Sequence, residues 1–509
     1  MRKFSRRDFL KLGWSIFGGG LVSTLIPKPA RLNKYDGKLP NIVVLVCDAM
    51  TARNLSIYGY SRKTTPNLEK LAEQAFVYHN HFSSGNFTVP GTSSLLTGLR
   101  PWTHQAINLA GVVGKKSIEH NIFRLLGNEY FKLAFSQNYW AADLLHQFSS
   151  DINSLLPASQ FGSVNGGAIY KKFQKDPVIA FHSLEEMFYY RKSLLLSFIF
   201  GLYYKFKINA VSSENYPAGF PVAQFYDNVF TMEDLFDGIS STILELDEHE
   251  SPYFSYFHIF PPHDPYNPHK DFAGRFDDDG YKPMAKRDHV LSDGTTQPSL
   301  DNERNRYDAF IANIDMEIGR LVASLKSRGV LDNTYFIITS DHGEMFERGT
   351  VGHTTPMLYD PVIRIPLLVL VPGNQTRQDF PAPTSNIDLL PTILGLTGME
   401  IPASCEGTLL PGLGGIGDSN RAIITMDAKE SPAHKPFTKA TYSIIKGNYK
   451  LIYYSGYIHK YQDYFEFYDL KEDPEELQDK YSKPRFSSII SEMRSELFLA
   501  MDEANRKLS

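Results

Sequence analysis

The sequence predicts an α/β fold with a large, mostly parallel central sheet and a smaller antiparallel sheet near the C-terminus. Residues 40–46 and 334–339 are continuous apolar runs rich in β-branched side chains, as expected for strands buried on both faces of a parallel sheet. Residues 307–329 carry apolar side chains at helical spacing, which predicts a long amphipathic helix. After about residue 420 the apolar side chains alternate, and Lys446-Gly447-Asn448 marks a hairpin turn.

Size and composition limit the classes of protein to which the chain can belong. It has 509 residues and a formal net charge of -5, which is enough chain for one large domain and a smaller one. The mild net charge and the lack of basic runs give no reason to expect nucleic acid as a partner. The two cysteines, Cys47 and Cys405, indicate neither a disulfide framework nor a cysteine zinc site, so we interpret both as buried or partly buried apolar side chains.

The N-terminal 30 residues match a twin-arginine (Tat) export signal. Residues 5–11 read SRRDFLK, and an apolar stretch and further basic residues follow. The apolar stretch, residues 12–26, is short for a membrane span. Residues 27–30 lack a clear cleavage pattern. We therefore expect export through the Tat machinery to the periplasm or beyond, with an uncleaved membrane anchor as the alternative.

The segment 86–98, NFTVPGTSSLLTG, is the first candidate for a reactive site. A proline and small polar residues precede an apolar run, which is typical of a helix start. Thr88 would then lie near a helix N-terminus, where backbone N–H groups and the helix dipole favour an anion such as phosphate or sulfate. The alternative is an ordinary polar turn, because short motifs often match by chance.

Two predicted strands end in potential metal ligands. Asp48 follows the strand at residues 40–46, and Ser-Asp-His-Gly-Glu at residues 340–344 follows the strand at 334–339. Parallel α/β sheets bind their ligands at the carboxyl ends of the strands. A carboxylate beside an imidazole, as in Asp341-His342, is a good donor set for a divalent metal. The alternative for Asp48 is a turn or helix-capping residue.

Several of these segments resemble the sulfatase family of the alkaline phosphatase superfamily. The similar parts are DAMTARNLSIYGYSRKTTPNLEKLA, TVPGTSSLLTGLRP, the strand that runs into PPHDPY, the SDHGE box and, more weakly, FEFYDLKEDPEE. The resemblance implies an alkaline-phosphatase-like three-layer sandwich. It also implies a catalytic domain at residues 38–415, with an insertion of unknown role at 141–250, and a C-terminal subdomain at 420–509. Residues 1–30 are the predicted signal.

The resemblance also implies an active site. Thr88 takes the position of the nucleophile, and His263 and His353 would bind the anionic oxygens or assist the leaving group. One divalent ion would be held by four side chains: Asp48, Thr88, Asp341 and His342. Manganese, magnesium, calcium and zinc all remain possible, and the histidine ligand favours a transition metal. We interpret His258, which lies inside a predicted strand, as structural.

Two departures from the family pattern affect the predicted chemistry. Sulfatases that use formylglycine have cysteine or serine where this chain has Thr88 and arginine where it has Thr92, and many have a second aspartate where it has Ala49. Threonine cannot become the aldehyde, so release of sulfate from a hemiacetal is unavailable, which favours phosphate. The resulting ligand set resembles that of one-metal phosphonate monoester hydrolases and of phosphoglycerol and phosphoethanolamine transferases.

The predicted function is therefore that of a metal-dependent sulfatase-family hydrolase. It would cleave sulfate or phosphate esters of small molecules or envelope lipids through a covalent Thr88 intermediate. The alternatives are a phospho-headgroup transferase of the cell envelope and a non-catalytic binding protein of the same fold. Residues 187–208 are rich in Leu, Phe and Tyr, and we interpret them as a helical insertion packed on the core. A flap that touches the membrane is the alternative, and the sequence leaves the oligomeric state open.

Overall fold

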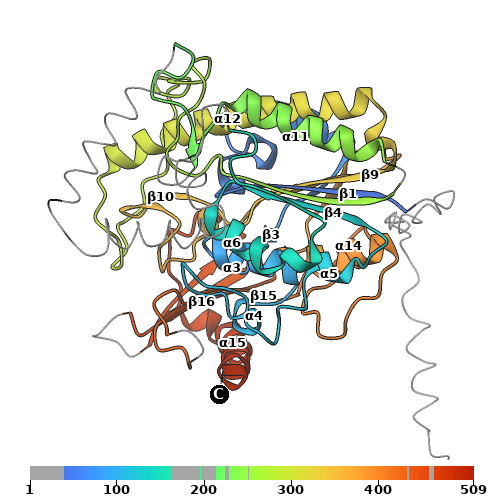
Figure 1. The fold of residues 1–509 in the computed structure, drawn as a ribbon. Coiled ribbons are helices and arrows are strands. Elements are labelled where there is room, and N and C mark those ends of the chain that lie inside the picture. Colours follow the sequence, from blue (N-terminus) through green and yellow to red (C-terminus); the bar gives the residue numbers. More distant parts are fainter. Residues whose placement is uncertain are drawn as a thin grey trace, which may run out of the picture. The chain divides into compact units, whose positions relative to one another are not determined.

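The structure is a computed structural model that describes residues 39–162, 195, 214–223, 228–249, 251–432, 435–457 and 463–508. At its centre is an eight-stranded sheet with the strand order β13-β2-β12-β9-β1-β8-β4-β5 (Figure 1). The strands are β1 (Asn41–Cys47), β2 (Ala75–Tyr78), β4 (Phe131–Ser136), β5 (Ser154–Leu156), β8 (Tyr253–Ile259), β9 (Thr334–Thr339), β12 (Leu367–Leu370) and β13 (Gln378–Phe380).

The central sheet is mostly parallel, as the sequence predicts. β1 pairs in parallel with both β8 and β9, and β4 pairs in parallel with β8 and β5. Only β12 is antiparallel to both of its neighbours, β2 and β9. The register sets Val46 beside both His258 and Thr339, and Ser136 beside His258. The carboxyl ends of β1, β4, β8 and β9 therefore meet at one edge of the sheet.

Helices cover both faces of this sheet. α2 (Pro66–Ala72), α11 (Met232–Asp247) and α12 (Gln297–Ser327) lie on one face (Figure 1). The other face is covered by α3 (Thr88–Thr97), α5 (Ile122–Leu125), α6 (Tyr139–Gln147) and α14 (Leu389–Thr397). The predicted three-layer α/β architecture is thus confirmed.

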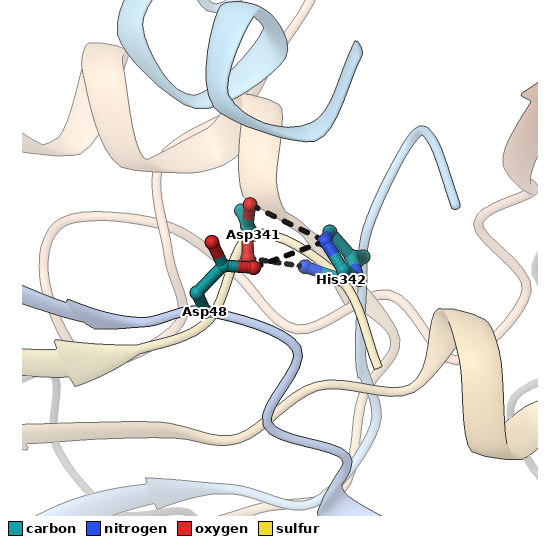
Figure 2. A group of neighbouring side chains, drawn as sticks. All are labelled: Asp48, Asp341 and His342. Carbon is teal, nitrogen blue, oxygen red and sulfur yellow. Dashed lines mark hydrogen bonds and ion pairs between the residues drawn. The ribbon is translucent and has the colours of Figure 1, made fainter. Parts of the chain in front are cut away.

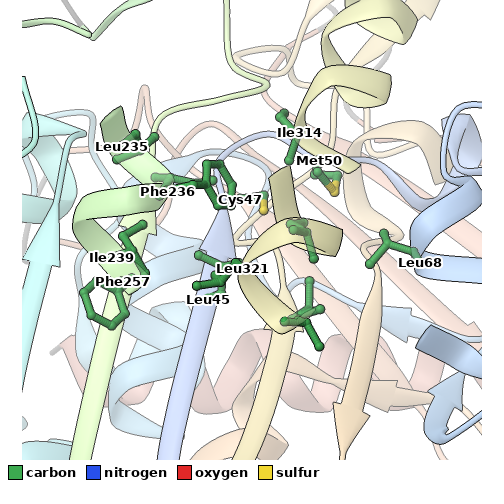
Figure 3. Packing of buried hydrophobic residues seen from close by; sticks show 14 of the residues in the cluster. Leu45, Cys47, Met50, Leu68, Leu235, Phe236, Ile239, Phe257, Ile314 and Leu321 are labelled. Carbon is green, nitrogen blue, oxygen red and sulfur yellow. The ribbon is translucent and has the colours of Figure 1, made fainter. Parts of the chain in front are cut away.

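The sequence of β1 explains why the sheet needs two helical layers. Every residue of β1 is buried, and alternate side chains point to opposite faces. Leu45 and Cys47 pack with side chains of α11 and α12, such as Ile239 and Leu321 (Figure 3), whereas Val44 belongs to the core on the other face. Each fully buried aliphatic side chain contributes about 1.5–3 kcal/mol, so neither layer is dispensable.

The long helix is present, but its predicted start is wrong. α12 begins at Gln297, ten residues before the predicted start at Tyr307, and it ends at Ser327. Its first residues, QPSLDNERNR, are mainly polar, so apolar spacing gives no sign of them. Proline in the first turn is compatible with the helix start, because its missing N–H would have no partner there.

A second, antiparallel sheet follows the central sheet in the chain. It consists of β15 (Ile423–Asp427), β16 (Ala440–Lys446), β17 (Tyr449–Ser455) and β18 (Asp463–Asp469), in that order. β16 and β17 form the predicted hairpin, with Gly447-Asn448 as its loop. α15 (Ser487–Leu508) packs on this sheet and on α4 (Pro101–His104). The small C-terminal sheet predicted from the sequence is confirmed.

Short elements complete the described part of the chain: β3 (His81–Phe82), β6 (Val222–Ala223), β7 (Asn228–Val229), β10 (Met345–Glu347), β11 (Thr350–Gly352), β14 (Thr384–Ser385) and α13 (Asp360–Ile363). Within that part, no helix combines the length and the apolar character needed to cross a bilayer. The predicted signal at 1–30 lies outside the described residues, as does the apolar segment at 187–208 except for Leu195.

Candidate active site

The carboxyl ends of β1 and β9 bring together three of the predicted ligands. Asp48 directly follows β1, and Asp341 and His342 follow β9 across the paired strands. One ligand atom from each of the three side chains lies within 4.8 Å of the others, and all three residues are fully buried. Figure 2 shows the side chains converging from separate strands, with His342 Nε2 3.2 Å from Asp48 Oδ1 and 3.6 Å from Asp341 Oδ2.

Thr88 lies at the start of α3, beside this cluster. Phe87 is extended and forms the N-cap, and Thr88 is the first helical residue. Its Oγ1 is 3.4 Å from His342 Nε2, so the fourth predicted ligand lies beside one of the other three. Gly91 allows the close approach of α3, because a Cβ at that position would meet the backbone oxygen of Asp341 at 2.3 Å. Larger side chains at Gly91 would displace Thr88 from the cluster.

The cluster leaves buried polar atoms without hydrogen bonds. Asp48 Oδ1, Asp341 Oδ2 and His258 Nε2 are buried and have no hydrogen-bond partner in the described part of the chain. Among the same residues, no lysine or arginine forms an ion pair with Asp48 or Asp341. Buried charge without a partner is costly, and a divalent cation offers these oxygens and nitrogens the partner they lack. The side chains therefore fit a metal ion.

Electrostatics within the cluster favour an anionic Asp48. Burial of Asp48 opposes its ionisation, yet the neighbouring imidazole of His258 and the charge of His263 hold the pKa of this carboxyl well below its usual range. Burial also opposes protonation of His342, but Asp341 and Asp48 raise the pKa of its imidazole to about 9. The cluster thus attracts positive charge, whether as a proton or as a cation.

A cavity of about 530 Å³ opens onto Thr88. Its polar lining includes His263, His353 and Glu344. Apolar and aromatic side chains form much of the remaining wall: Phe87, Leu109, Trp140, Val222, Phe260 and Tyr266. A cavity of this size accommodates a small ester with its leaving group.

The two predicted catalytic histidines lie together in this cavity but differ in charge. The ring centroids of His263 and His353 are 4.9 Å apart. His263 Nδ1 is 3.0 Å from an Asp264 oxygen, and although burial opposes protonation, Asp264 raises the pKa of His263 to about 10. Burial and the neighbouring His342 and His263 hold the pKa of His353 well below its usual range. His263 is therefore a cation that suits an anionic group, and His353 is a neutral imidazole.

Three further residues belong to this site but were not assigned to it from the sequence. His258, interpreted as structural, has its Nε2 3.4 Å from Asp48 Oδ2 and 3.7 Å from Asp341 Oδ2. Glu344 Oε2 and His353 Nδ1 form a hydrogen bond of 3.1 Å. Asn138 follows β4 and contacts Thr88 and Asp48. The strand-end rule, applied to residues 131–136, could have found Asn138.

The position of the family's second aspartate is occupied by backbone instead of a side chain. Ala49 has a φ of 61°, an uncommon conformation for a residue other than glycine, and its N–H donates to Asp341 Oδ1 over 3.3 Å. Tyr307 donates from its hydroxyl to the Ala49 carbonyl over 2.7 Å, which holds this turn in place. The missing carboxylate is thus replaced by a contact that orients Asp341.

Comparison with known proteins establishes the family. Residues 40–399 match the family described as Sulfatase, and residues 353–503 match N-sulphoglucosamine sulphohydrolase, C-terminal. The chain belongs to the sulfatase family. It is a sulfatase-like hydrolase of the alkaline phosphatase superfamily, so the resemblance drawn from the sequence motifs is confirmed. This assignment argues against the alternative of a non-catalytic binding protein.

Relatives of known name cover nearly the whole chain. A choline-sulfatase of Rhizobium meliloti is 22% identical over 88% of this chain and 83% of its own length. An arylsulfatase of Clostridium perfringens is 21% identical over 91% of this chain and 94% of its own length.

Solved structures share the fold. The phosphonate monoester hydrolase of Agrobacterium radiobacter superposes with a TM-score of 0.67 at 17% identity, covering 91% of this chain and 96% of its own. A second protein, solved in complex with its substrate D-glucosamine-2-N,6-O-disulfate, superposes with a TM-score of 0.65 at 17% identity. The match covers 92% of this chain and 98% of that protein's chain.

Proposed function

We propose that this protein is a metal-dependent hydrolase of phosphate or sulfate esters in which Thr88 forms a covalent intermediate. The observation that carries the proposal is the position of the Thr88 hydroxyl. It stands at a helix N-terminus, opens into the cavity, and lies 3.4 Å from His342 Nε2 in the buried carboxylate cluster. A hydroxyl is a weak nucleophile unless its surroundings activate it, and this cluster offers such surroundings.

The proposed cofactor is one divalent ion held by Asp48, Thr88, Asp341 and His342. Manganese, magnesium, calcium and zinc are all candidates, and the imidazole donor favours a transition metal. When bound, such an ion supplies positive charge that acidifies a nearby hydroxyl and offsets the charge on the transferred group. The unpartnered oxygens of Asp48 and Asp341 support this part of the proposal.

Residues of the chain take part in both displacement steps, the formation of the Thr88 adduct and its hydrolysis. The Thr88 oxygen attacks phosphorus or sulfur while the bond to the leaving oxygen breaks and takes its electron pair with it. The hydroxyl proton of Thr88 is released to solvent, and the cationic His263 gives its proton to the leaving oxygen. Water then attacks the same central atom and gives a proton to the now neutral His263, while the electron pair of the breaking bond returns to the Thr88 oxygen, which takes up a proton from solvent.

The identity of the nucleophile favours phosphate over sulfate. Thr88 offers no aldehyde, so its adduct has to be released by direct attack at the central atom. Phosphoryl groups undergo such in-line displacement with charge stabilisation by positioned donors and ions. The similarity to a choline-sulfatase and to a phosphonate monoester hydrolase names two further ester classes that belong in the test.

A transferase is the second candidate function. The same Thr88 adduct could pass its group to an acceptor alcohol instead of water. The apolar cavity wall, with Phe87, Leu109 and Trp140, favours this alternative because it suits the lipid part of an envelope substrate. Product analysis with glycerol or ethanolamine as the acceptor distinguishes the two functions.

The test is an activity screen on aryl phosphate monoesters and diesters, phosphonates and sulfates, with each metal added in turn. Thr88→Ala should abolish turnover and keep the metal content nearly intact, whereas Thr88→Ser should keep partial activity. Thr97→Ala is the matched control, because Thr97 lies in the same helix and its buried hydroxyl bonds the Ser93 carbonyl and the Leu99 backbone N–H, away from the cluster. Full activity of Thr88→Ala would reject the proposal.

We also propose that the protein leaves the cytoplasm through the Tat system. SRRDFLK at residues 5–11 supports this, and the Tat system suits an enzyme that must bind its ion before export, since such a site does not exist in an unfolded chain. Replacing Arg6 and Arg7 by lysine should retain the protein in the cytoplasm, as cell fractionation would detect. Unchanged export of this variant would rule the route out.

A further inference from the structure

The side-chain amide of Asn138 is held in one orientation. Asn138 is the N-cap of α6, and its Oδ1 accepts a hydrogen bond from the backbone N–H of Trp140 over 2.9 Å. The Ser136 hydroxyl bonds both the backbone N–H and the carbonyl of Asn138, at 3.1 Å and 2.9 Å. Because the cap uses the oxygen of the amide, its NH₂ group faces the active site.

This NH₂ group serves two acceptors in the site. Asn138 Nδ2 is 3.1 Å from Thr88 Oγ1 and 2.5 Å from Asp48 Oδ2, and all three residues are buried. An amide carries two N–H bonds, so one can point to each oxygen. The Thr88 oxygen therefore receives a hydrogen bond from a donor that is fixed before any substrate arrives.

We propose that Asn138 is a catalytic residue, whose N–H stabilises the negative charge that develops on the Thr88 oxygen. This inference rests on the proposed role of Thr88 as the nucleophile. Preorganised donors aimed at an oxygen where charge develops give some of the largest single contributions to catalysis, because they need no reorganisation during the reaction. Hydrogen bonds to an ionised acceptor are also stronger than those to a neutral one.

The threonine explains why such a donor matters in the second step. When water attacks the adduct, the bond between the central atom and the Thr88 oxygen breaks, and the electron pair stays on that oxygen. The oxygen then has to bear the charge until it takes up a proton. Asn138 Nδ2 is already within hydrogen-bonding distance of it, so the amide should act mainly on the release of the adduct.

The test separates the catalytic donor from the helix cap. Serine is as good an N-cap as asparagine but cannot place an N–H on Thr88, so Asn138→Ser should preserve α6. With an activated aryl phosphate, we expect kcat to fall roughly 100-fold, the scale seen when one such donor is removed. Metal content and melting temperature should stay near those of the wild type. Acid-quenched turnover mixtures should contain a larger fraction of chains with an adduct on Thr88, measured by mass spectrometry.

Asn121 provides the matched control. It is also a buried N-cap asparagine, with Oδ1 accepting from the Arg124 N–H over 2.9 Å and Nδ2 3.0 Å from an Asp151 carboxylate oxygen. It does not contact the cluster at Asp48. Asn121→Ser should therefore leave both kcat and the adduct fraction unchanged.

Three outcomes would contradict the inference or its basis. Wild-type kcat in Asn138→Ser would overturn it. A loss of activity that merely follows a loss of metal or of folded protein would assign Asn138 a structural role and overturn it too. Full activity of Thr88→Ala would instead reject the proposed function, whereas an inactive Thr88→Ala beside a fully active Asn138→Ser rejects only this inference.

Discussion

Two groups of buried charges in this protein differ in how they are balanced. The strand-edge cluster, formed by Asp48, Asp341, His258 and His342, has imidazoles as its only basic side chains among the recorded ion pairs of the described residues. The junction cluster lies between α13 and the C-terminal sheet and consists of Asp360, Glu476, Lys450, Arg348 and Arg364. There Lys450, which is fully buried, is 2.6 Å from Glu476 Oε1 and 3.8 Å from Asp360 Oδ1.

The junction cluster supplies its own counter-charges. Arg364 lies 3.8 Å from Asp360 Oδ2, and the Arg348 guanidinium stands over the ring of Tyr359 at 3.9 Å. Burial opposes ionisation of Asp360, but Lys450 and Arg364 hold the pKa of this carboxyl below its usual range. Lysine and arginine are always available as cations at neutral pH, so this cluster needs no ligand.

The strand-edge cluster lacks such permanent cations. Each cluster holds two buried carboxylate oxygens without a hydrogen-bond partner in the described part of the chain, Asp48 Oδ1 and Asp341 Oδ2 at the strand edge and Asp360 Oδ1 and Glu476 Oε1 at the junction, so the counter-charge is what differs. Buried carboxylates alone therefore do not indicate a metal site. What distinguishes the functional cluster is the missing counter-charge, together with its place at the carboxyl edge of parallel strands.

The largest expected effect is the loss of catalysis on disabling the strand-edge cluster. Asp341→Asn removes one carboxylate ligand, and we expect kcat/KM to fall about 1,000-fold or more, since a catalytic ion supplies several kcal/mol of transition-state stabilisation. Elemental analysis of the purified variant should show less than one ion per chain. Asp360→Asn is the control, because it changes a buried carboxylate outside the strand-edge cluster. This variant should retain the metal content of the wild type. A full complement of metal in Asp341→Asn would contradict the assignment.

Breaking the junction cluster should affect stability instead. Lys450→Met leaves Glu476 and Asp360 buried without their main cation, and we expect the free energy of unfolding to fall by about 3–5 kcal/mol. Activity per folded molecule should not change, because the junction cluster contributes no side chain to the cavity. Denaturant titration combined with active-site counting measures both quantities. A stability equal to that of the wild type would show that the pair is not needed.

The cavity histidines should give an intermediate effect. His353→Asn removes an imidazole that lines the cavity but is not among the predicted metal ligands, and we expect kcat to fall about 100-fold, the lower range for loss of one acid–base group. The metal content should remain that of the wild type, which separates His353 from His342. If the variant lost its ion together with its activity, His353 would belong to the metal site instead.

The smallest effect concerns a buried histidine with no carboxylate beside it. Burial lowers the pKa of His104 to about 3, so His104 is neutral in the folded protein. Its contribution to stability is complete above pH 6.5, the ordinary value, and is lost as the pH falls toward 3, at about 1.4 kcal/mol per pH unit. His104→Gln should reduce the slope of unfolding free energy against pH by this amount between pH 6 and pH 4.5. Equal slopes in the two proteins would contradict the argument.

The sequence predicts the parts of the molecule that depend on local pattern. Residues 334–339 are recognised as a strand because a β-branched apolar run ends at polar residues, and β9 has these same bounds. The proximity of Asp48, Asp341 and His342 follows from the rule that parallel strands share an edge, whereas Thr88 is placed beside them by the resemblance to the sulfatase family. Their roles stay predictions until turnover is measured.

Other features depend on strand order, which no local pattern encodes. Asn138 and His258 reach Asp48 only because β8 and β4 follow β1 in the sheet order, and a strand histidine or a capping asparagine is common in any protein. The polar start of α12 is hidden for a related reason. Its Arg304 is buried through a contact with the carbonyl of Phe346, which lies far away in the sequence.

The central claim is that Thr88 carries the transferred group during turnover. The most direct measurement is mass spectrometry of the metal-loaded enzyme after acid quenching of a reaction with an activated aryl phosphate. We expect a single phosphoryl group on the peptide that contains Thr88, retained in quenched samples and absent from Thr88→Ala. Turnover without any such adduct in the pre-steady-state phase, or an adduct on another residue, would contradict the account.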